Sequence, residues 1–194
     1  TDDTLRTVRM EHRDGKLIGY LPHQPPAGKL QYNVFLSKNQ QQIKVSDESI
    51  SIRFKGAVPD YILIPHIILM FTAMLFSTRT GIEALIKGKQ IFRYTTVTLI
   101  TLFLGGLVLG PLVQLHAFNE LWAGWPFGGD LTDNKTLVAF IFWLIAFFRI
   151  RKSNKNRWWA VVAAIMLLAV YLIPHSVLGS EYNYESGEIQ TGKN

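Results

Sequence analysis

Apolar residues are distributed in two different ways along the chain. After residue 60 they form four long stretches, whereas the first 55 residues alternate apolar and polar side chains. The long stretches cover residues 62–76, 91–113, 136–148 and 158–178. Since a helix rises about 1.5 Å per residue, about 20 residues cross a hydrocarbon core about 30 Å thick. With flanking residues added, the pattern predicts four transmembrane helices, at about 61–78, 91–114, 134–150 and 157–178.

The alternation near the start has a period of two, which is typical of strands with one buried face. It predicts five short strands, in TLRTVRME, GKLIGYL, KLQYNVFLS, QQIKV and SISIRFKG. The phrase LPHQPPAGKLQYNVFL, a proline- and glycine-containing turn before a strand with a tyrosine, resembles bacterial extracytoplasmic Ig-like or fibronectin-type modules. The resemblance covers residues 16–55 and implies a β-sandwich. Because a complete sandwich has about seven strands, we expect a partial one whose open edge accepts a partner strand.

Together these patterns predict an α+β membrane protein, with a partial N-terminal β-sandwich followed by a four-helix transmembrane bundle. The expected divisions are an extracytoplasmic β domain over residues 1–57, the helical domain over 58–180, and an extracytoplasmic tail over 181–194.

Basic residues cluster in two of the connections between helices. These residues are Arg79, Lys87, Lys89 and Arg93 after the first helix, and Arg149, Arg151, Lys152, Lys155 and Arg157 after the third. Because Lys and Arg remain in cytoplasmic loops, we expect both chain ends outside a bacterial cytoplasmic (inner) membrane. The clustering also accounts for the formal net charge of +6, so nucleic acid is not an expected partner.

Three histidines are expected at one level, near the outer ends of their helices. His66 and His175 each complete a Leu-Ile-Pro-His segment, and His116 follows Pro111 and Gln114. Three alternatives remain open: anchoring of helix ends, a b-type haem or His-ligated Cu, Zn or Fe site, and a proton or quinone role. The chain has no cysteine, so thiolate and iron–sulfur sites are excluded.

The segment HAFNELWAGWPFGGDLTDNK contains the densest chemistry of the chain, including Glu120, Asp130 and Asp133. One interpretation is an aromatic belt followed by a helix start, with Thr132 or Asp133 as the N-cap. The other is a lid over the histidines, in which the acids bind a metal or orient a ligating imidazole.

Two further patterns lie within the predicted helices. Met70 and Met74 continue the spacing of His66, a stripe suited to Cu(I) or to ordinary packing. Gly106 and Gly110 have the small-xxx-small spacing of close helix contacts. The third helix is bulky and apolar all round, so we expect it to face lipid or a large partner.

The sequence has no nucleophile triad, phosphate-binding loop, HExxH or EF-hand pattern, and we assign no catalytic residue. The favoured function is a non-catalytic subunit or anchor that binds other membrane-protein subunits and lipid through its β domain and helices. The alternative is a haem- or metal-binding protein for redox or metal handling that uses the three histidines.

Overall fold

The computed structural model describes residues 6–38, 41–45, 48–173, 181–182 and 189–190. The chain divides into two compact units. The first, here called the β unit, comprises Thr1–Gly56 and Glu181–Gln190. The second, the helical unit, comprises Ala57–Ser180 and Thr191–Asn194.

The helical unit contains four helical segments of membrane-spanning length and composition. They are α1 (Asp60–Leu85); α2 (Ile91–Leu102) continued by the π-helix η1 (Phe103–Leu109) and α3 (Gly110–Phe118); α4 (Leu131–Lys152); and the short 3-10 helix η2 (Asn154–Asn156) followed by α5 (Trp158–Leu172). The prediction of a multi-pass membrane protein with a helix bundle is therefore confirmed.

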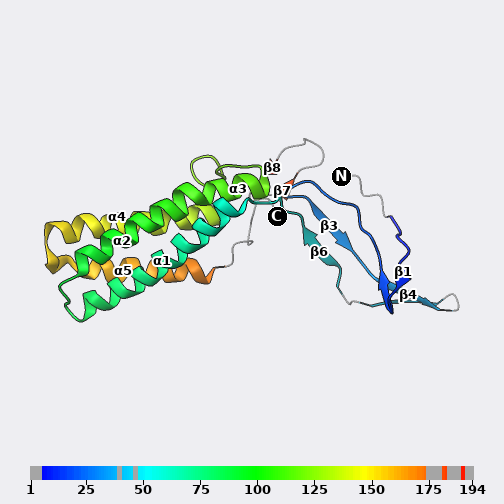
Figure 1. Ribbon diagram of the computed structural model, residues 1–194, viewed down its shortest axis with the longest axis horizontal. Helices are drawn as coiled ribbons and strands as arrows, with labels where there is room; N and C mark the ends of the chain where they lie inside the picture. Colours follow the sequence, from blue (N-terminus) through cyan, green and yellow to red (C-terminus); the bar gives the residue numbers. More distant parts are fainter. Residues whose placement is uncertain (1–5, 39–40, 46–47, 174–180, 183–188, 191–194) are drawn as a thin grey trace. The chain divides into compact units, whose positions relative to one another are not determined.

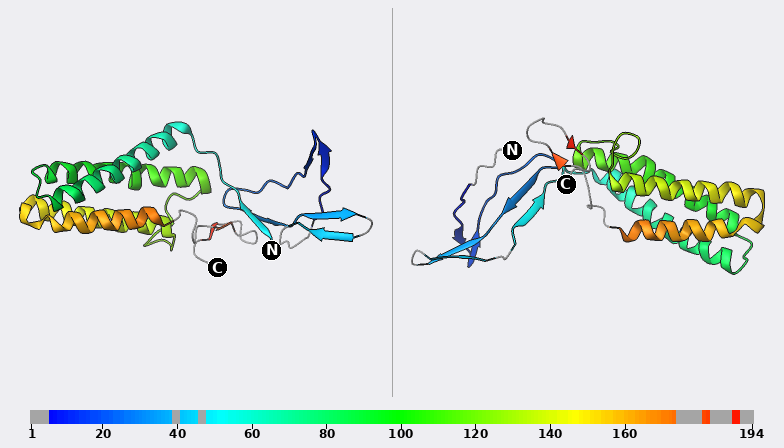
Figure 2. Two further views of the ribbon diagram at one scale, coloured as in Figure 1. Left: turned by 90° about the horizontal axis from the view of Figure 1, so that it is seen from below. Right: turned by 180° about the vertical axis from the view of Figure 1, so that it is seen from behind.

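The four segments form an antiparallel bundle (Figure 1). Helix α1 packs against α2 and α5, and α4 packs against the same two helices. The α1–α2 and α4–α5 turns lie at one end of the bundle, and the loop of residues 119–130 lies at the other (Figures 1 and 2). We call these the basic end and the loop end.

Helix α1 extends seven residues beyond its predicted end at residue 78. Arg79, which we had placed in the connection, lies inside the helix and forms an ion pair of 2.6 Å with Glu83 one turn later. Such a pair stabilises a helix, and hydropathy alone does not register it. Glu83 is itself buried.

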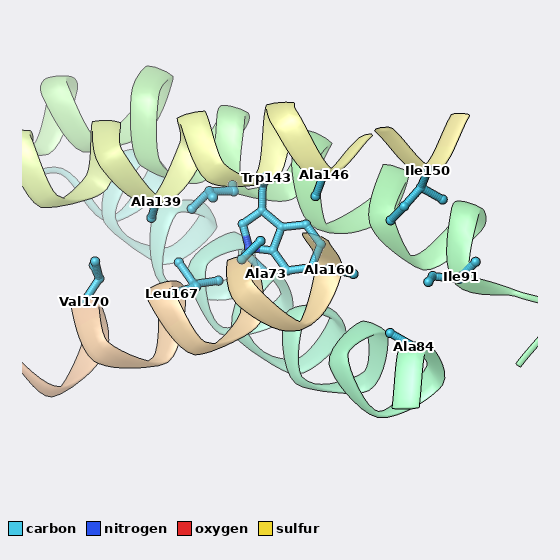
Figure 3. Packing of buried hydrophobic residues seen from close by; sticks show 12 residues of the cluster. Ala73, Ala84, Ile91, Ala139, Trp143, Ala146, Ile150, Ala160, Leu167 and Val170 are labelled. Atoms are coloured by element: carbon cyan, nitrogen blue, oxygen red, sulfur yellow. The ribbon is translucent and has the colours of Figure 1, made fainter. Parts of the chain in front are cut away.

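The core of the helical unit consists largely of small side chains around one tryptophan. The indole of Trp143 on α4 is fully buried and extends toward Ala73 and Ala160 (Figure 3). The indole occupies a large volume, so the side chains that pack against it must be small, as alanine is. The helix predicted to be apolar all round has one buried face, formed by Ala139, Trp143 and Ala146, and exposed apolar residues on its other side.

The β unit contains short antiparallel pairs rather than a sandwich among its described residues. The strands are β1 (Glu11–Arg13), β2 (Lys16–Ile18), β3 (Lys29–Tyr32), β4 (Phe35–Lys38), β5 (Gln41–Lys44), β6 (Ile50–Arg53), β7 (Glu181–Tyr182) and β8 (Ile189–Gln190). The pairs are β1–β2, β3–β6, β4–β5 and β7–β8. The third predicted strand is thus divided in two at Asn33 and Val34.

The β4–β5 pair has one apolar face. Leu36 lies opposite Ile43, and the backbone N–H of Val45 donates to the carbonyl of Val34 at 2.8 Å, which continues the same register. Side chains alternate across a strand, so these four residues share a face. Leu36, Ile43 and Val45 are 50%, 67% and 57% exposed. The core of the helical unit is filled, whereas the apolar side chains on this face of the β4–β5 pair are left uncovered.

Candidate functional site

His66 lies on α1 toward the loop end and is tied to the neighbouring helix. Its Nδ1 is 2.9 Å from the carbonyl oxygen of Gly105. A carbonyl only accepts, so Nδ1 donates, and in the neutral ring Nε2 then carries the lone pair. Donation to a backbone carbonyl is also how proteins orient an imidazole whose other nitrogen binds a ligand.

The Gly105 carbonyl is part of the π-helix η1, where it also accepts from the N–H of Gly110. Pro111 follows directly and has no N–H, so the α-helical bond to the Leu107 carbonyl cannot form. A π-helical turn accommodates this change of pairing. Gly105 and Gly106 are both buried in that segment, and α1 lies close to Gly105 while α4 lies close to Gly106.

The two glycines of the predicted packing motif differ in their surroundings. A β-carbon at Gly106 would lie 2.8 Å from Cγ2 of Thr136 on α4, which requires a shift. At Gly110 the nearest such contact is 3.6 Å, which is ordinary. The tight contacts thus belong to Gly106 and to Gly105, whose β-carbon would lie 3.0 Å from Cβ of Leu69.

The other two candidate histidines do not complete a site in the described part of the chain. His116 is exposed near the end of α3. His175 lies outside the described residues, so convergence with His66 stays a prediction. Within the described residues, no three His, Asp or Glu side chains are grouped to hold a metal ion.

The acids of the loop serve the start of α4. Asp130 is the N-cap residue and accepts from the N–H groups of Thr132 and Asp133. We had expected Thr132 or Asp133 to be the N-cap, and this expectation was wrong. Asp133 instead accepts from the N–H of Ala123, at 2.7 Å. Glu120 is half-buried, and its Oε2 has no hydrogen-bond partner among the described residues.

The methionines of the predicted stripe lie on α1. Met70 packs against η1, since a β-carbon at Gly105 would be 3.1 Å from its sulfur. Met74 is half-buried one turn later. The Met70 carbonyl accepts a hydrogen bond of 2.6 Å from the hydroxyl of Tyr171 on α5.

Several polar contacts between helices were missed from the sequence. Lys135 donates from Nζ to the carbonyl of Ile173 at 2.7 Å, joining α4 to the end of α5. The hydroxyls of Thr80 and Thr98 lie 3.5 Å apart between α1 and α2, and each also donates to its own helix. Thr95, Thr98 and Thr101, which recur at three-residue spacing in α2, were the available signal.

The basic end is closed by Glu83. Its Oε1 accepts from the N–H of Gln90, the N-cap residue of α2, at 2.9 Å. Its other oxygen pairs with Arg79, whose guanidinium lies 4.9 Å from the ring centroid of Tyr94. The buried carboxylate is thus paired, and it fixes the turn between the two helices.

No protein family, curated protein or solved structure matches the chain.

Proposed function

We propose that the protein is a non-catalytic integral-membrane subunit or anchor whose β unit binds another membrane-protein subunit. The observation that carries this proposal is the apolar face formed by exposed Leu36, Ile43 and Val45 together with half-buried Val34. Two strands are marginal by themselves in water, and an antiparallel pair with one apolar face normally packs that face on a second layer. A sheet of the partner would supply that layer and complete the expected sandwich.

The test uses neighbouring residues that point to opposite faces of β5. A photo-crosslinker replaces Ile43 or, as the matched control, Gln42 in the full-length chain in its native membrane. We expect position 43 to give one protein adduct of defined mass, and position 42 to give none. The change Ile43→Lys should abolish co-purification of that partner, whereas Gln42→Lys should not.

The opposite result is as informative. If position 43 crosslinks only to lipid or to nothing, and Ile43→Lys changes no association, the β unit does not carry partner binding. An adduct of twice the chain mass would identify the partner as a second copy.

We further propose that the basic end faces the cytoplasm of a bacterial cell, with the β unit outside its inner membrane. The support is the accumulation of Lys and Arg in the α1–α2 and α4–α5 turns. Since the chain lacks cysteine, Asn154→Cys supplies a unique thiol. It should react with an impermeant maleimide only after the cells are opened, and labelling of intact cells would refute this orientation.

A second candidate function is haem or metal binding for redox or metal handling. The specific observation that favours it is the bond from His66 to the Gly105 carbonyl, which leaves Nε2 for a ligand. His116, His175, Glu120, Asp130 and Asp133 remain the proposed further residues. An absorption spectrum with elemental analysis of the purified protein tests this function, and absence of a Soret band and of stoichiometric Cu, Zn or Fe counts against it.

A further inference from the structure

The loop between α3 and α4 presents two aromatic side chains outward. Residues 121–129 carry no charge, and they lie between Glu120 and Asp130. Within them Trp125 and Phe127 are 70% and 84% exposed, the latter the most exposed large apolar side chain described. We call Trp125, Pro126 and Phe127 the aromatic tip.

The tip is fastened to the first turn of α4. The N–H of Trp125 donates to Oδ1 of Asn134 at 2.6 Å, and the N–H of Ala123 donates to Oδ2 of Asp133 at 2.7 Å. Both acceptors belong to the segment Leu131–Lys152, which has the length and composition of a membrane span. The loop therefore folds back beside the start of α4 instead of extending away from it.

Bonds within the loop keep the tip compact. The N–H groups of Phe127 and Gly128 both donate to the carbonyl of Gly124, and the N–H of Asp130 donates to the carbonyl of Ala123. Phe127 is only four residues before Leu131, so the chain limits their separation to about 14 Å. The headgroup layer is roughly 5–8 Å thick on each side of the hydrocarbon core, and the tip is thereby restricted to its vicinity.

We propose that the aromatic tip inserts into the lipid headgroup layer and sets the depth of the α3–α4 hairpin. Tryptophan prefers this layer because its ring is apolar and its N–H is polar. The tip contains no charge that insertion would desolvate. The loop that carries it connects two helical segments of membrane-spanning length. The loop then acts as a fixed anchor in the bilayer, held by Asp133 and Asn134, and this role does not depend on partner binding by the β unit.

The absence of native cysteine allows a direct measurement of depth. Phe127→Cys in the full chain carries a bimane fluorophore, and the purified protein is placed in lipid nanodiscs. Ile141→Cys, exposed ten residues into α4, is the deep control, and Lys155→Cys at the basic end is the aqueous control. We expect the Phe127 probe to be quenched more by a lipid spin label near the headgroup than by one near the chain end. The probe at position 141 should be quenched more by the label near the chain end, and aqueous iodide should quench mainly the probe at position 155.

A second pair of variants tests the fastening. Asn134→Ala removes the acceptor for Trp125 and should raise iodide quenching of the Phe127 probe, whereas Asn134→Asp keeps an acceptor oxygen and should preserve the lipid pattern. If the original probe is quenched by iodide as strongly as Lys155 and by neither lipid label, the tip stands in water, as a docking element for a protein would, and the proposal is overturned. An unchanged pattern in Asn134→Ala would overturn the role of the fastening.

Discussion

In the helical unit, most buried apolar side chains form one cluster contributed by α1, α2, α4 and α5, whereas in the described β unit Ala27 is the only buried apolar side chain. Both units also expose large apolar residues. For the helices this exposure is expected, because a bilayer solvates apolar surface. For the β4–β5 pair the exposure has a different meaning, since water does not solvate apolar surface well.

An exposed isoleucine therefore has a different significance in each unit. Ile141 is exposed on α4, which is long and apolar enough to cross a membrane, so lipid would cover it without a further protein partner. Ile43 on β5 lies on a sheet face that lacks a second layer. Only the second kind of exposure motivates the proposed partner surface.

The β unit should lose the most when it is separated from the rest of the chain. Residues 1–57 expressed alone should show no cooperative unfolding transition, because the described strands enclose almost no core. Circular dichroism during thermal and urea titration, with amide chemical-shift dispersion, provides the measurement. A monomeric fragment with a sigmoidal transition would show that the β unit needs no partner.

Within the helical unit, buried and outward-facing apolar residues should differ strongly in their contribution to stability. Trp143→Ala should cost about 3–5 kcal/mol of unfolding free energy, because it empties the centre of the cluster. Ile141→Ala on the lipid-facing side of the same helix should change it by at most about 0.5 kcal/mol. Denaturant titration in mild detergent checks both, and equal losses would mean that Trp143 does not organise the core.

The four helices were predictable because length and hydropathy suffice to identify a membrane span. The buried face of α4 was not, because its exposed side is as apolar as its buried side. Ala139, Trp143 and Ala146 recur at helical spacing, but Val138 and Ile141 remove the contrast that would make this visible. In a membrane, positions buried between helices are distinguished by small side chains, and in this protein these surround Trp143.

The candidate site was predictable only in its local parts. The sequence indicated that an acid or threonine starts α4, since short polar residues favour N-caps, but not that Asp130 is the cap. The bonds from His66 to Gly105 and from Lys135 to Ile173 join residues far apart in the chain. Such contacts depend on helix rotation and on the π-helix before Pro111, which periodicity does not specify.

A smaller effect tests close packing with two glycines of one helix. Gly106→Ala should cost about 1–3 kcal/mol, because the new methyl group meets Thr136 across the interface with α4. Gly110→Ala, whose β-carbon has ordinary space, should stay within about 0.5 kcal/mol of the wild type. The same denaturant titration applies. A larger loss of unfolding free energy for Gly110→Ala than for Gly106→Ala would place the essential close contact at Gly110.

The smallest effect concerns hydrogen bonding between the helices. Tyr171→Phe removes the hydroxyl that donates to the Met70 carbonyl and leaves the ring in place. Hydrogen bonds between membrane helices contribute about 0.6 kcal/mol on average and at most about 1.7, because the unfolded chain in the membrane also finds partners. Tyr61→Phe, at an exposed position in the first turn of α1, is the matched control and should have no measurable effect.

A loss in that range for Tyr171→Phe, well below the loss for Trp143→Ala, would show that the helical unit is stabilised mainly by packing around its buried tryptophan. The Met70 carbonyl lies inside α1, so the helix ladder still offers it an N–H after the hydroxyl is removed, and no unpaired group remains in the membrane. A loss above about 2 kcal/mol would exceed what one such bond supplies. Tyr171 would then have a structural role beyond this contact, and the contrast between a packed helical unit and an unfilled β unit would need polar contacts as a second cause.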